Sequence, residues 1–321
     1  MEELHGLASS LTLVDESELE TRTISKNPVR LPNDVIIQIL SWIHPNKVLK
    51  YRRLNRDSNK IVLSKHFALL NKSRCNVNFN DNIYTFASSW FHWPQPYQIT
   101  HMGSISYIAY LDLSMRNLKG PFPVILCTHL TKLTSLNLSN NRISGEIPGE
   151  IKNLKNLESL FLEMNQLTGE IPTEISHLPY LETLALNNNT LSGPIPKDIG
   201  NLQLLLYLFL QNNNLSGPIP DSIGTLGCLN QLNLSNNKLS GAIPDALGDL
   251  PYIQEIDLSN NELEGDIPLS VYIKMEEEGL RLNSLHLFGN QLNRVPPQMA
   301  HFEVERGSFT FASLYTGSLG Y

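Results

Sequence analysis

The sequence predicts an α/β repeat solenoid preceded by a small helical domain. The first observation is a pattern, LxxLxLxxNxLxGxIP, that recurs from about residue 108 onward. The second is an amphipathic stretch at residues 31–43, within a segment rich in Lys and Arg. The third is the composition, because a chain of 321 residues that is 41% apolar and 17% charged fits a soluble globular protein of about two domains.

Eight copies of the pattern follow one another in phase. Their first residues are 24 or 25 positions apart, except for a spacing of 29 before the last copy. Repeats of this length with leucines at fixed positions are leucine-rich repeats, and each predicts one coil that buries its apolar face only against its neighbours. The first residues of the copies are Ile108, Leu133, Leu157, Leu181, Leu205, Leu229, Ile253 and Leu282.

The order of residues within one copy predicts the shape of its coil. Alternating leucines such as Leu160 and Leu162 point one way from a strand, into an interior shared between coils. A proline follows in each GxIP segment, as at Pro148 and Pro172, and it excludes a helix at that point and favours an extended return. Parallel strands lie about 4.8 Å apart, so eight coils predict a sheet roughly 35 Å wide.

An asparagine occupies the ninth position of every copy except the first, which has Arg116. A polar binding strip is one interpretation of this row. A structural ladder is the better prediction, because a side-chain amide both donates and accepts hydrogen bonds and can satisfy backbone groups in a tight turn. The row comprises Asn141, Asn165, Asn189, Asn213, Asn237, Asn261 and Asn290.

The outward positions of the strands are where a ligand surface is expected, since packing dictates the inward leucines. Many outward residues are Asn, Ser or Thr. Large aromatic side chains on a strand face are typical of an interaction surface, although the same residues could instead pack on one another along the ladder. The candidate target-binding residues are Tyr110, Phe161, Glu163, Tyr207, Phe209, Gln211, His286 and Phe288, with Phe161, Tyr207 and Phe209 expected in one patch.

The repeats resemble the plant-type leucine-rich-repeat subfamily of receptor-kinase ectodomains and polygalacturonase-inhibiting proteins. The G-x-[IF]-P element, present seven times between Gly120 and Pro268, is the basis of the resemblance. The resemblance implies a curved solenoid, a leucine-rich-repeat horseshoe, that binds other molecules through its concave strand face.

The segment before the repeats predicts three short helices. Residues 31–43 place Ile36, Ile39, Leu40 and Ile43 on one helix face, with Asn33 as the N-cap. Two further helices are indicated around residues 48–54 and 61–70. Helices this short do not bury a self-sufficient core, so their apolar surface needs a partner or a docking face.

This helical segment resembles an F-box, the motif that docks substrate receptors onto the Skp-type linker subunit of cullin-RING ubiquitin ligases. The matching residues are Leu31-Pro32, Asp34, Ile39-Leu40, Ile43, Pro45, Val48-Leu49, Tyr51-Arg52, Leu54, Asn55-Arg56 and Phe67. The resemblance implies linker-subunit contacts for Leu31, Pro32, Ile39, Leu40, Ile43, Leu49 and Tyr51.

Charge is distributed unevenly along the chain, whose net charge is -7. Residues 29–74 have an excess of Lys and Arg, whereas residues 108–296 have an excess of Asp and Glu. A basic helical segment fits an acidic linker subunit. It also fits nucleic acid in principle, but no recognised nucleic-acid module surrounds it, and a helical cap for the first repeat is the other alternative.

The predicted organisation follows from these segments. Three cysteines without CxxC spacing and the lack of a secretory signal or membrane-spanning stretch favour the cytoplasm or nucleus.

Residues 274–278 are expected to form a solvated insertion, or else a contact site. The units are a disordered acidic tail at 1–28, an F-box-like domain at 29–74, a linker and cap at 75–107 with aromatic residues at 84–97, eight repeats at 108–296, and a C-terminal cap or disordered tail at 297–321.

No motif for catalysis is present. The sequence has no phosphate-binding loop, no GxSxG, no HExxH and no zinc-finger spacing of Cys and His. We therefore expect no enzyme activity, no cofactor and no metal. The leading hypothesis is a non-catalytic substrate receptor of a cullin-RING ubiquitin ligase that binds a protein target on the strand face. The alternative is a stand-alone protein-binding scaffold or inhibitor whose N-terminal helices only cap the solenoid.

Overall fold

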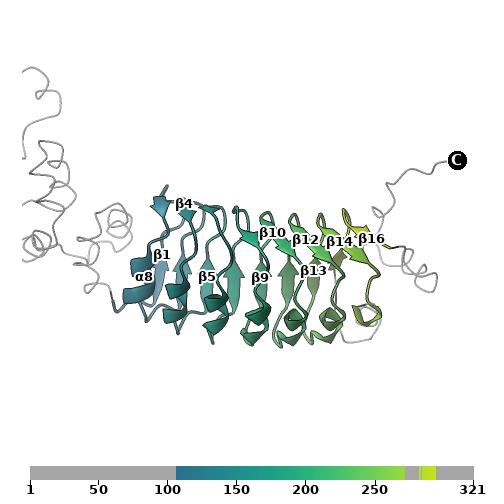
Figure 1. Cartoon of the computed structure of the whole chain (residues 1–321). Helices are drawn as coiled ribbons and strands as arrows, with labels where there is room; N and C mark the ends of the chain where they lie inside the picture. Colours follow the sequence, from purple (N-terminus) through teal and green to yellow (C-terminus); the bar gives the residue numbers. More distant parts are fainter. Residues whose placement is uncertain (1–105, 272–281, 283, 294–321) are drawn as a thin grey trace, which may run out of the picture. The chain divides into compact units, whose positions relative to one another are not determined.

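The computed structural model describes residues 106–271, 282 and 284–293. The chain divides into two compact units, Met1–Ile105 and Ser106–Tyr321, and every described residue belongs to the second. Successive coils of this second unit stack side by side (Figure 1). The predicted repeat solenoid is confirmed.

One parallel sheet takes a strand from each of the eight coils. Neighbouring strands pair in register, so equivalent residues of successive repeats lie side by side; Leu160, for example, pairs with Leu136 and with Leu184. This register confirms the predicted phase of all eight copies. In sheet order the strands are β1 (Tyr110–Asp112), β3 (Ser135–Asn137), β5 (Ser159–Phe161), β7 (Thr183–Ala185), β9 (Tyr207–Phe209), β11 (Gln231–Asn233), β13 (Glu255–Asp257) and β15 (Ser284–His286).

A second strand follows in each coil, and these strands form two further parallel sheets. The glycine of the GxIP element ends most of these strands with a positive φ, as at Gly193 (φ +75°), where a Cβ would lie 2.7 Å from Glu170 Cγ. These strands are β2 (Lys119–Pro121), β4 (Arg142–Gly145), β6 (Gln166–Leu167), β8 (Ser192–Gly193), β10 (Asn214–Gly217), β12 (Lys238–Gly241), β14 (Glu262–Gly265) and β16 (Gln291–Leu292).

Short helices form the return side of the first six coils. The extended backbone expected at the prolines is confirmed at Pro148 (φ -76°, ψ 147°), but a five-residue 3-10 helix begins at the very next residue. Proline is tolerated at this boundary because its missing N–H would have no helical partner. The helices are α8 (Val124–His129), η3 (Gly149–Asn153), η4 (Thr173–His177), η5 (Lys197–Asn201), η6 (Asp221–Thr225) and η7 (Asp245–Asp249).

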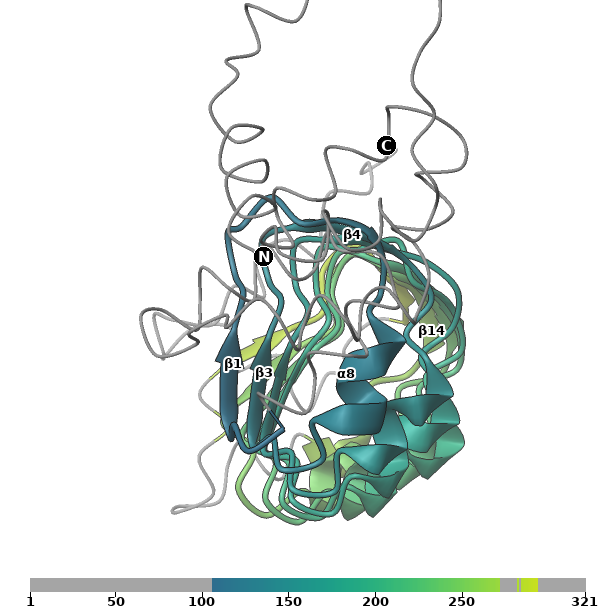
Figure 2. The same cartoon turned by 90° about the vertical axis from the view of Figure 1, so that its left-hand side faces the viewer.

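The interior lies between the large sheet and these helices (Figure 2). Its side chains are the repeat leucines and isoleucines, so that Leu160, Leu184 and Leu208 have no exposed surface. Each short helix also packs on the helix of the next coil. A leucine truncated to alanine in such a core costs about 2–5 kcal/mol of folding free energy.

The ninth-position asparagines form a structural ladder, as predicted. Asn189 Oδ1 accepts a hydrogen bond from the backbone N–H of Leu167 in the preceding coil (3.0 Å), and its Nδ2 donates to the carbonyls of Leu162 and Leu186 (3.0 Å each). One amide thus satisfies backbone groups in two coils and ties the coils together. The same pattern recurs at Asn141, Asn165, Asn213, Asn237, Asn261 and Asn290.

Candidate functional site: the strand face of the solenoid

The strand face is the outward side of the eight-stranded sheet, made by the third, fifth and seventh positions of each repeat. The in-register pairing places the fifth-position residues in one row, where Phe161 pairs with Ala185 and Ala185 with Phe209. The third-position row brings Tyr207 next to Thr183 and Gln231. The register of the sheet therefore determines which outward side chains are neighbours.

Three of the predicted residues lie close together in the middle of this face. Phe161, Tyr207 and Phe209 are half-buried, and with Ala185 between them they define what we call the aromatic patch. Phe161 and Phe209 are two strands apart, or about 9.6 Å. The small Ala185 at the centre is 3% exposed, so the larger side chains around it leave almost none of its surface open to solvent.

The aromatic rings pack within a strand and not along the ladder. Tyr207 and Phe209 are two residues apart on β9, and their rings stack with centroids 6.1 Å apart and an interplanar angle of 24°. Phe161 makes no ring contact with either within the described part of the chain. Packing along the ladder therefore does not explain the presence of these aromatics on the face.

A polar row that spans the same three strands lies beside the patch at the seventh position. Glu163 follows β5, Asn187 follows β7 and Gln211 follows β9. Glu163 Oε2 and Gln211 Oε1 are shielded from solvent, and neither has a hydrogen-bond partner. Burial raises the pKa of the Glu163 carboxyl above its ordinary value, although its own backbone and the Ser139 hydroxyl stabilise the charged form. Both oxygens are acceptors without a donor.

The other predicted target-binding residues lie toward the two ends of the sheet. Tyr110 is on the first strand and is 70% exposed. His286 and Phe288 belong to the last coil, where their rings meet edge to face with centroids 6.4 Å apart and where Ser284 Oγ lies 2.6 Å from His286 Nε2. The eight residues therefore fall into three groups along the sheet and not into a single cluster.

Met164 lies next to Glu163 in the chain and is an exposed apolar side chain that was not singled out from the sequence. It has a left-handed backbone (φ +56°) and is 52% exposed. The equivalent positions of most other coils have asparagine, such as Asn188 and Asn212, which tolerates this backbone better. Comparing the eighth position between repeats would have identified Met164, together with Met115 of the first repeat, as exposed apolar side chains in an unfavourable conformation.

Charge on the strand face has one sign. At its outward positions the described residues include Asp112, Glu163, Glu255 and Asp257, and no Lys or Arg. Two exposed carboxylates, Glu158 and Glu182, come directly before β5 and β7. The basic side chains of the described coils lie elsewhere. Examples on the second strand of a coil are Lys119, Arg142 and Lys238, and examples on the short helices are Lys152 and Lys197.

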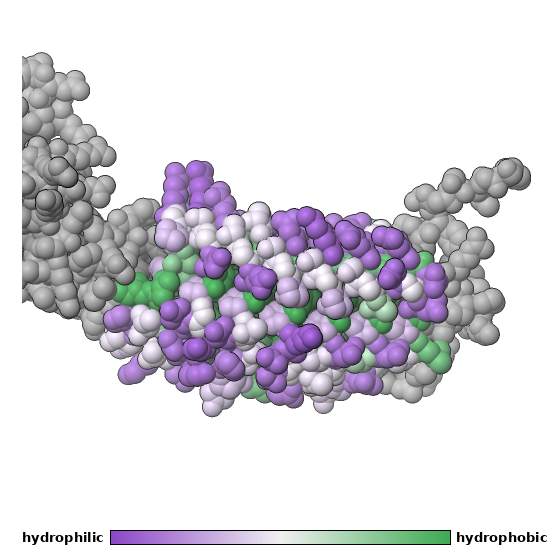
Figure 3. All heavy atoms as spheres, viewed as in Figure 1, coloured by the Kyte–Doolittle hydropathy of each residue, from purple (hydrophilic) through white to green (hydrophobic). Residues whose placement is uncertain are grey.

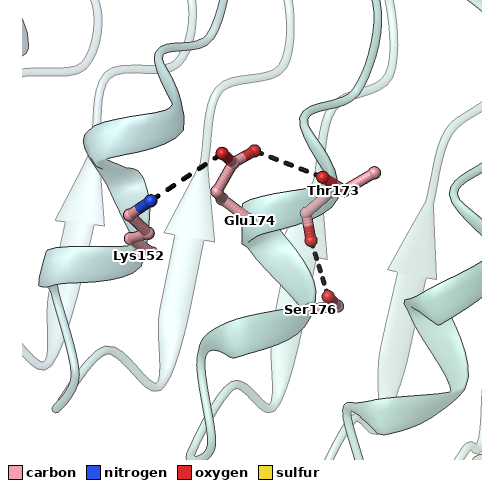
Figure 4. A network of polar contacts seen from close by, with 4 residues as sticks. All are labelled: Lys152, Thr173, Glu174 and Ser176. Carbon is pink, nitrogen blue, oxygen red and sulfur yellow. Dashed lines mark hydrogen bonds and ion pairs between the residues drawn. The ribbon is translucent and has the colours of Figure 1, made fainter.

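The helix side of the solenoid differs in kind. Its polar groups pair with one another: Lys152 Nζ is 3.8 Å from Glu174 Oε1, Thr173 Oγ1 donates to Glu174 Oε2 (3.3 Å), and Ser176 Oγ donates to the Thr173 carbonyl (2.6 Å) (Figure 4). Figure 3 views this side and shows mixed hydrophilic and neutral residues, with small hydrophobic spots between them and a larger hydrophobic area at the left end of the coloured coils.

The described coils contain no cluster of metal-ligating side chains and one fully buried cysteine. No group of three or more His, Cys, Asp or Glu residues among them is placed to hold a metal ion. Cys127 is fully buried, and burial raises the pKa of its thiol to about 12, so it remains protonated at neutral pH. No helix within the described ranges is long and apolar enough to cross a membrane.

The remaining predictions concern residues outside the described ranges. These are the aromatic cap at 84–97, the insertion at 274–278, the C-terminal tail and the candidate linker-subunit contacts Leu31, Pro32, Ile39, Leu40, Ile43, Leu49 and Tyr51.

Comparison with known proteins agrees with the repeat architecture. Residues 96–302 match the family model of a leucine-rich repeat region. The comparison with curated protein sequences gave no match. Among solved structures, the chain is similar to the plant peptide hormone receptor RGFR1 in complex with RGF2, at 39% identity over 59% of this chain and 30% of that chain, with a TM-score of 0.56.

Two further solved structures are similar to the chain. One is a plant ice-binding protein, at 33% identity over 58% of this chain and 57% of that chain, with a TM-score of 0.50. The other is PEPR1–AtPEP1, at 33% identity over 60% of this chain and 33% of that chain, also with a TM-score of 0.50. The chain thus spans between 30% and 57% of the length of these three structures.

Proposed function

The chain belongs to the leucine-rich repeat family, and on this premise we propose that it is a non-catalytic recognition module that binds a protein segment on its strand face. Proteins of this family are typically binding scaffolds, and no catalytic motif occurs in the sequence. The observation with the greatest weight is the aromatic patch. Its rings are partly exposed on an open sheet face, and aromatic residues in such positions contribute large contact areas at low entropic cost.

Two of the similar structures favour a peptide or an extended protein segment as the ligand. RGFR1 was solved in complex with RGF2, and the other structure pairs PEPR1 with AtPEP1. A plant peptide hormone receptor at 39% identity gives a reason to test short peptides first.

Selection of peptides tests this function without knowledge of the target. A phage-displayed library of random dodecapeptides would be selected on the immobilised full chain, and enriched peptides would be titrated against variants. Phe161→Ser/Phe209→Ser should weaken binding about tenfold or more, because it removes the two largest apolar contacts of the patch. The matched control is Tyr180→Ser/Tyr252→Ser, which removes two exposed aromatics outside the strands and should leave binding unchanged.

The outcomes separate clearly. Peptides that bind the patch variant and the wild type equally well, with both proteins folded, would place recognition elsewhere on the molecule. A folded chain that enriches no peptide over several rounds would argue against a peptide-recognition function.

A second candidate function is more specific: the chain is the substrate receptor of a cullin-RING ubiquitin ligase. Its support is the F-box-like pattern at residues 29–74, which begins with Leu31-Pro32 and continues through Ile39-Leu40 and Tyr51. In this mechanism the N-terminal segment binds the Skp-type linker subunit and the strand face holds the target. The receptor acts by raising the local concentration of target lysines near the conjugating enzyme, and this requires a cytoplasmic or nuclear location.

Titration of the full chain with the Skp-type linker subunit tests this second candidate. The expected result is saturable binding that Leu31→Ala/Pro32→Ala weakens by about 2 kcal/mol or more, as for hot-spot residues. Lys47→Ala is a control outside the predicted contact set and should act mainly on the association rate. A folded chain that fails to bind the subunit would contradict the ubiquitin-ligase function and would be compatible with the recognition scaffold alone.

A further inference from the structure

We propose that the strand face between β5 and β9 takes a basic segment of a partner protein, with one arginine or lysine of that segment between Phe161 and Phe209 and hydrogen-bonded to Glu163 and Gln211. This inference rests on the proposed function and names the chemistry of the ligand. It has three parts: the sign of the charge, the two acceptors without donors, and the aromatic rings beside them.

The charge of the face selects a cation. The carboxylates Asp112, Glu163, Glu255 and Asp257 occupy its outward positions, and Glu158 and Glu182 stand exposed at its edge, next to β5 and β7. No Lys or Arg occupies an outward position of the described strands. Charges of one sign on an open surface attract a partner of the opposite sign, which speeds encounter and disfavours acidic partners.

The individual carboxylates of the face are not equivalent. Asp112 Oδ1 accepts from the backbone N–H of Ser114 (2.9 Å), and Asp257 Oδ1 accepts from the N–H and hydroxyl of Ser259 (3.0 and 2.6 Å). These two acids are engaged in local turns. Glu163 differs, because its Oε2 is shielded from solvent and has no partner, although its own backbone and the Ser139 hydroxyl stabilise the charged carboxylate. An unsatisfied acceptor shielded from water costs free energy that an incoming donor recovers.

Gln211 supplies a second acceptor of the same kind. Its Oε1 is also shielded and without a partner, and it lies at the equivalent position two strands from Glu163. Both side chains are only half-buried, so rotation about their broad terminal torsions brings the oxygens to the surface. A guanidinium has five N–H donors in a planar fork and can donate to two acceptors at once.

The aromatic patch completes a site for a long cationic side chain. Phe161 and Phe209 flank the small Ala185, in the row next to the one that holds Glu163 and Gln211. The methylene stem of an arginine or lysine packs against aromatic rings, and its charged end is attracted to their faces. The exposed Met164 adds an adaptable apolar contact beside Glu163.

The test is a charge census of selected peptides followed by titration. Dodecapeptides enriched on the full chain should contain more Lys and Arg than the unselected library. For one enriched peptide, replacement of its critical Arg by Gln should weaken binding to the wild-type protein about tenfold. The same replacement should change the affinity for the Glu163→Gln variant only slightly. The matched control, Glu255→Gln, removes one carboxylate from the same face four strands away from β5 and should preserve the difference between the two peptides.

Each alternative result has a definite meaning. Enriched peptides that are uncharged and lose affinity with Phe161→Ser/Phe209→Ser would overturn the basic ligand while leaving the recognition function intact. Equal losses with Glu163→Gln and Glu255→Gln would show only general electrostatic attraction and overturn the specific site. A dimer in light scattering that the patch substitutions abolish, without enrichment of basic peptides, would assign the face to a second copy of the chain and also overturn the proposal.

Discussion

The inward and outward positions of the same short strands obey different rules. Inward, the coils repeat nearly the same residues: Leu160, Leu184 and Leu208 are fully buried, and Asn189 is one of a row of seven asparagines. Outward, the same three strands present Phe161, Ala185 and Phe209, which differ from coil to coil. Packing and backbone hydrogen bonds dictate the first set, whereas the fold leaves the second set free. Substitutions in the two sets should therefore separate stability from binding.

The largest expected effect is on stability. Asn189→Leu should lower the free energy of unfolding by about 2–4 kcal/mol, because it leaves the N–H of Leu167 and the carbonyls of Leu162 and Leu186 without their partner. Urea denaturation followed by circular dichroism measures this. Asn187→Ala is the control, since its side chain makes no hydrogen bond and it should cost less than about 0.5 kcal/mol. Equal losses from both variants would contradict the ladder.

The next effect is on binding alone. Phe161→Ser/Phe209→Ser should reduce the affinity for a selected peptide about tenfold or more while changing the unfolding free energy by less than the ladder variant does. Isothermal titration and denaturation on the same samples provide the two numbers. A loss of stability comparable to that of Asn189→Leu would mean that these rings belong to the packed core. It would contradict the assignment of stability to inward positions and of binding to outward positions.

A smaller effect distinguishes Glu163 from a structural residue. Burial raises the pKa of its carboxyl in the folded protein, so ionisation of Glu163 lowers the folding stability. This loss of stability is absent below the ordinary pKa and grows as the pH rises from the ordinary pKa through the raised one. Glu163→Gln should therefore raise the melting temperature by about 1 °C at neutral pH and by nothing in mild acid. Thermal unfolding across this pH range checks the sign. A lower melting temperature at neutral pH would contradict it.

The smallest effect is expected on the helix side. Lys152 and Glu174 form an ion pair at 3.8 Å in which both side chains are partly exposed, at 48% and 32%. Exposed pairs of this kind contribute about 0–1 kcal/mol, so Lys152→Ala should change neither stability nor peptide affinity measurably. A clear loss of affinity in that variant would move the recognition surface away from the strand face.

The sequence was most informative where every coil repeats the same requirement. The phase of the eight strands and the asparagine ladder followed from the repeat itself, because the same backbone groups must be satisfied in each coil. The 3-10 helix after Pro148 did not follow, since an extended proline restricts its own φ and says little about the next residue.

Single residues of the candidate site were harder to foresee. The aromatic candidates were visible as exceptions to a row of small polar residues, but the stacking of Tyr207 on Phe209 depends on their side-chain conformations. The missing partners of Glu163 and Gln211 depend on the side chains that surround them in neighbouring coils. Met164 left a signal at the eighth position that comparison of the repeats could have detected.

The central claim is that the strand face around the aromatic patch holds the ligand. The most direct measurement is photo-crosslinking of a selected peptide that has a benzophenone side chain, followed by mass spectrometry of the crosslinked full chain. The account predicts crosslinks at outward residues in and beside β5, β7 and β9, among them Met164, and their loss in Phe161→Ser/Phe209→Ser. Crosslinks confined to the helices η3 to η7, unaffected by that variant, would contradict it.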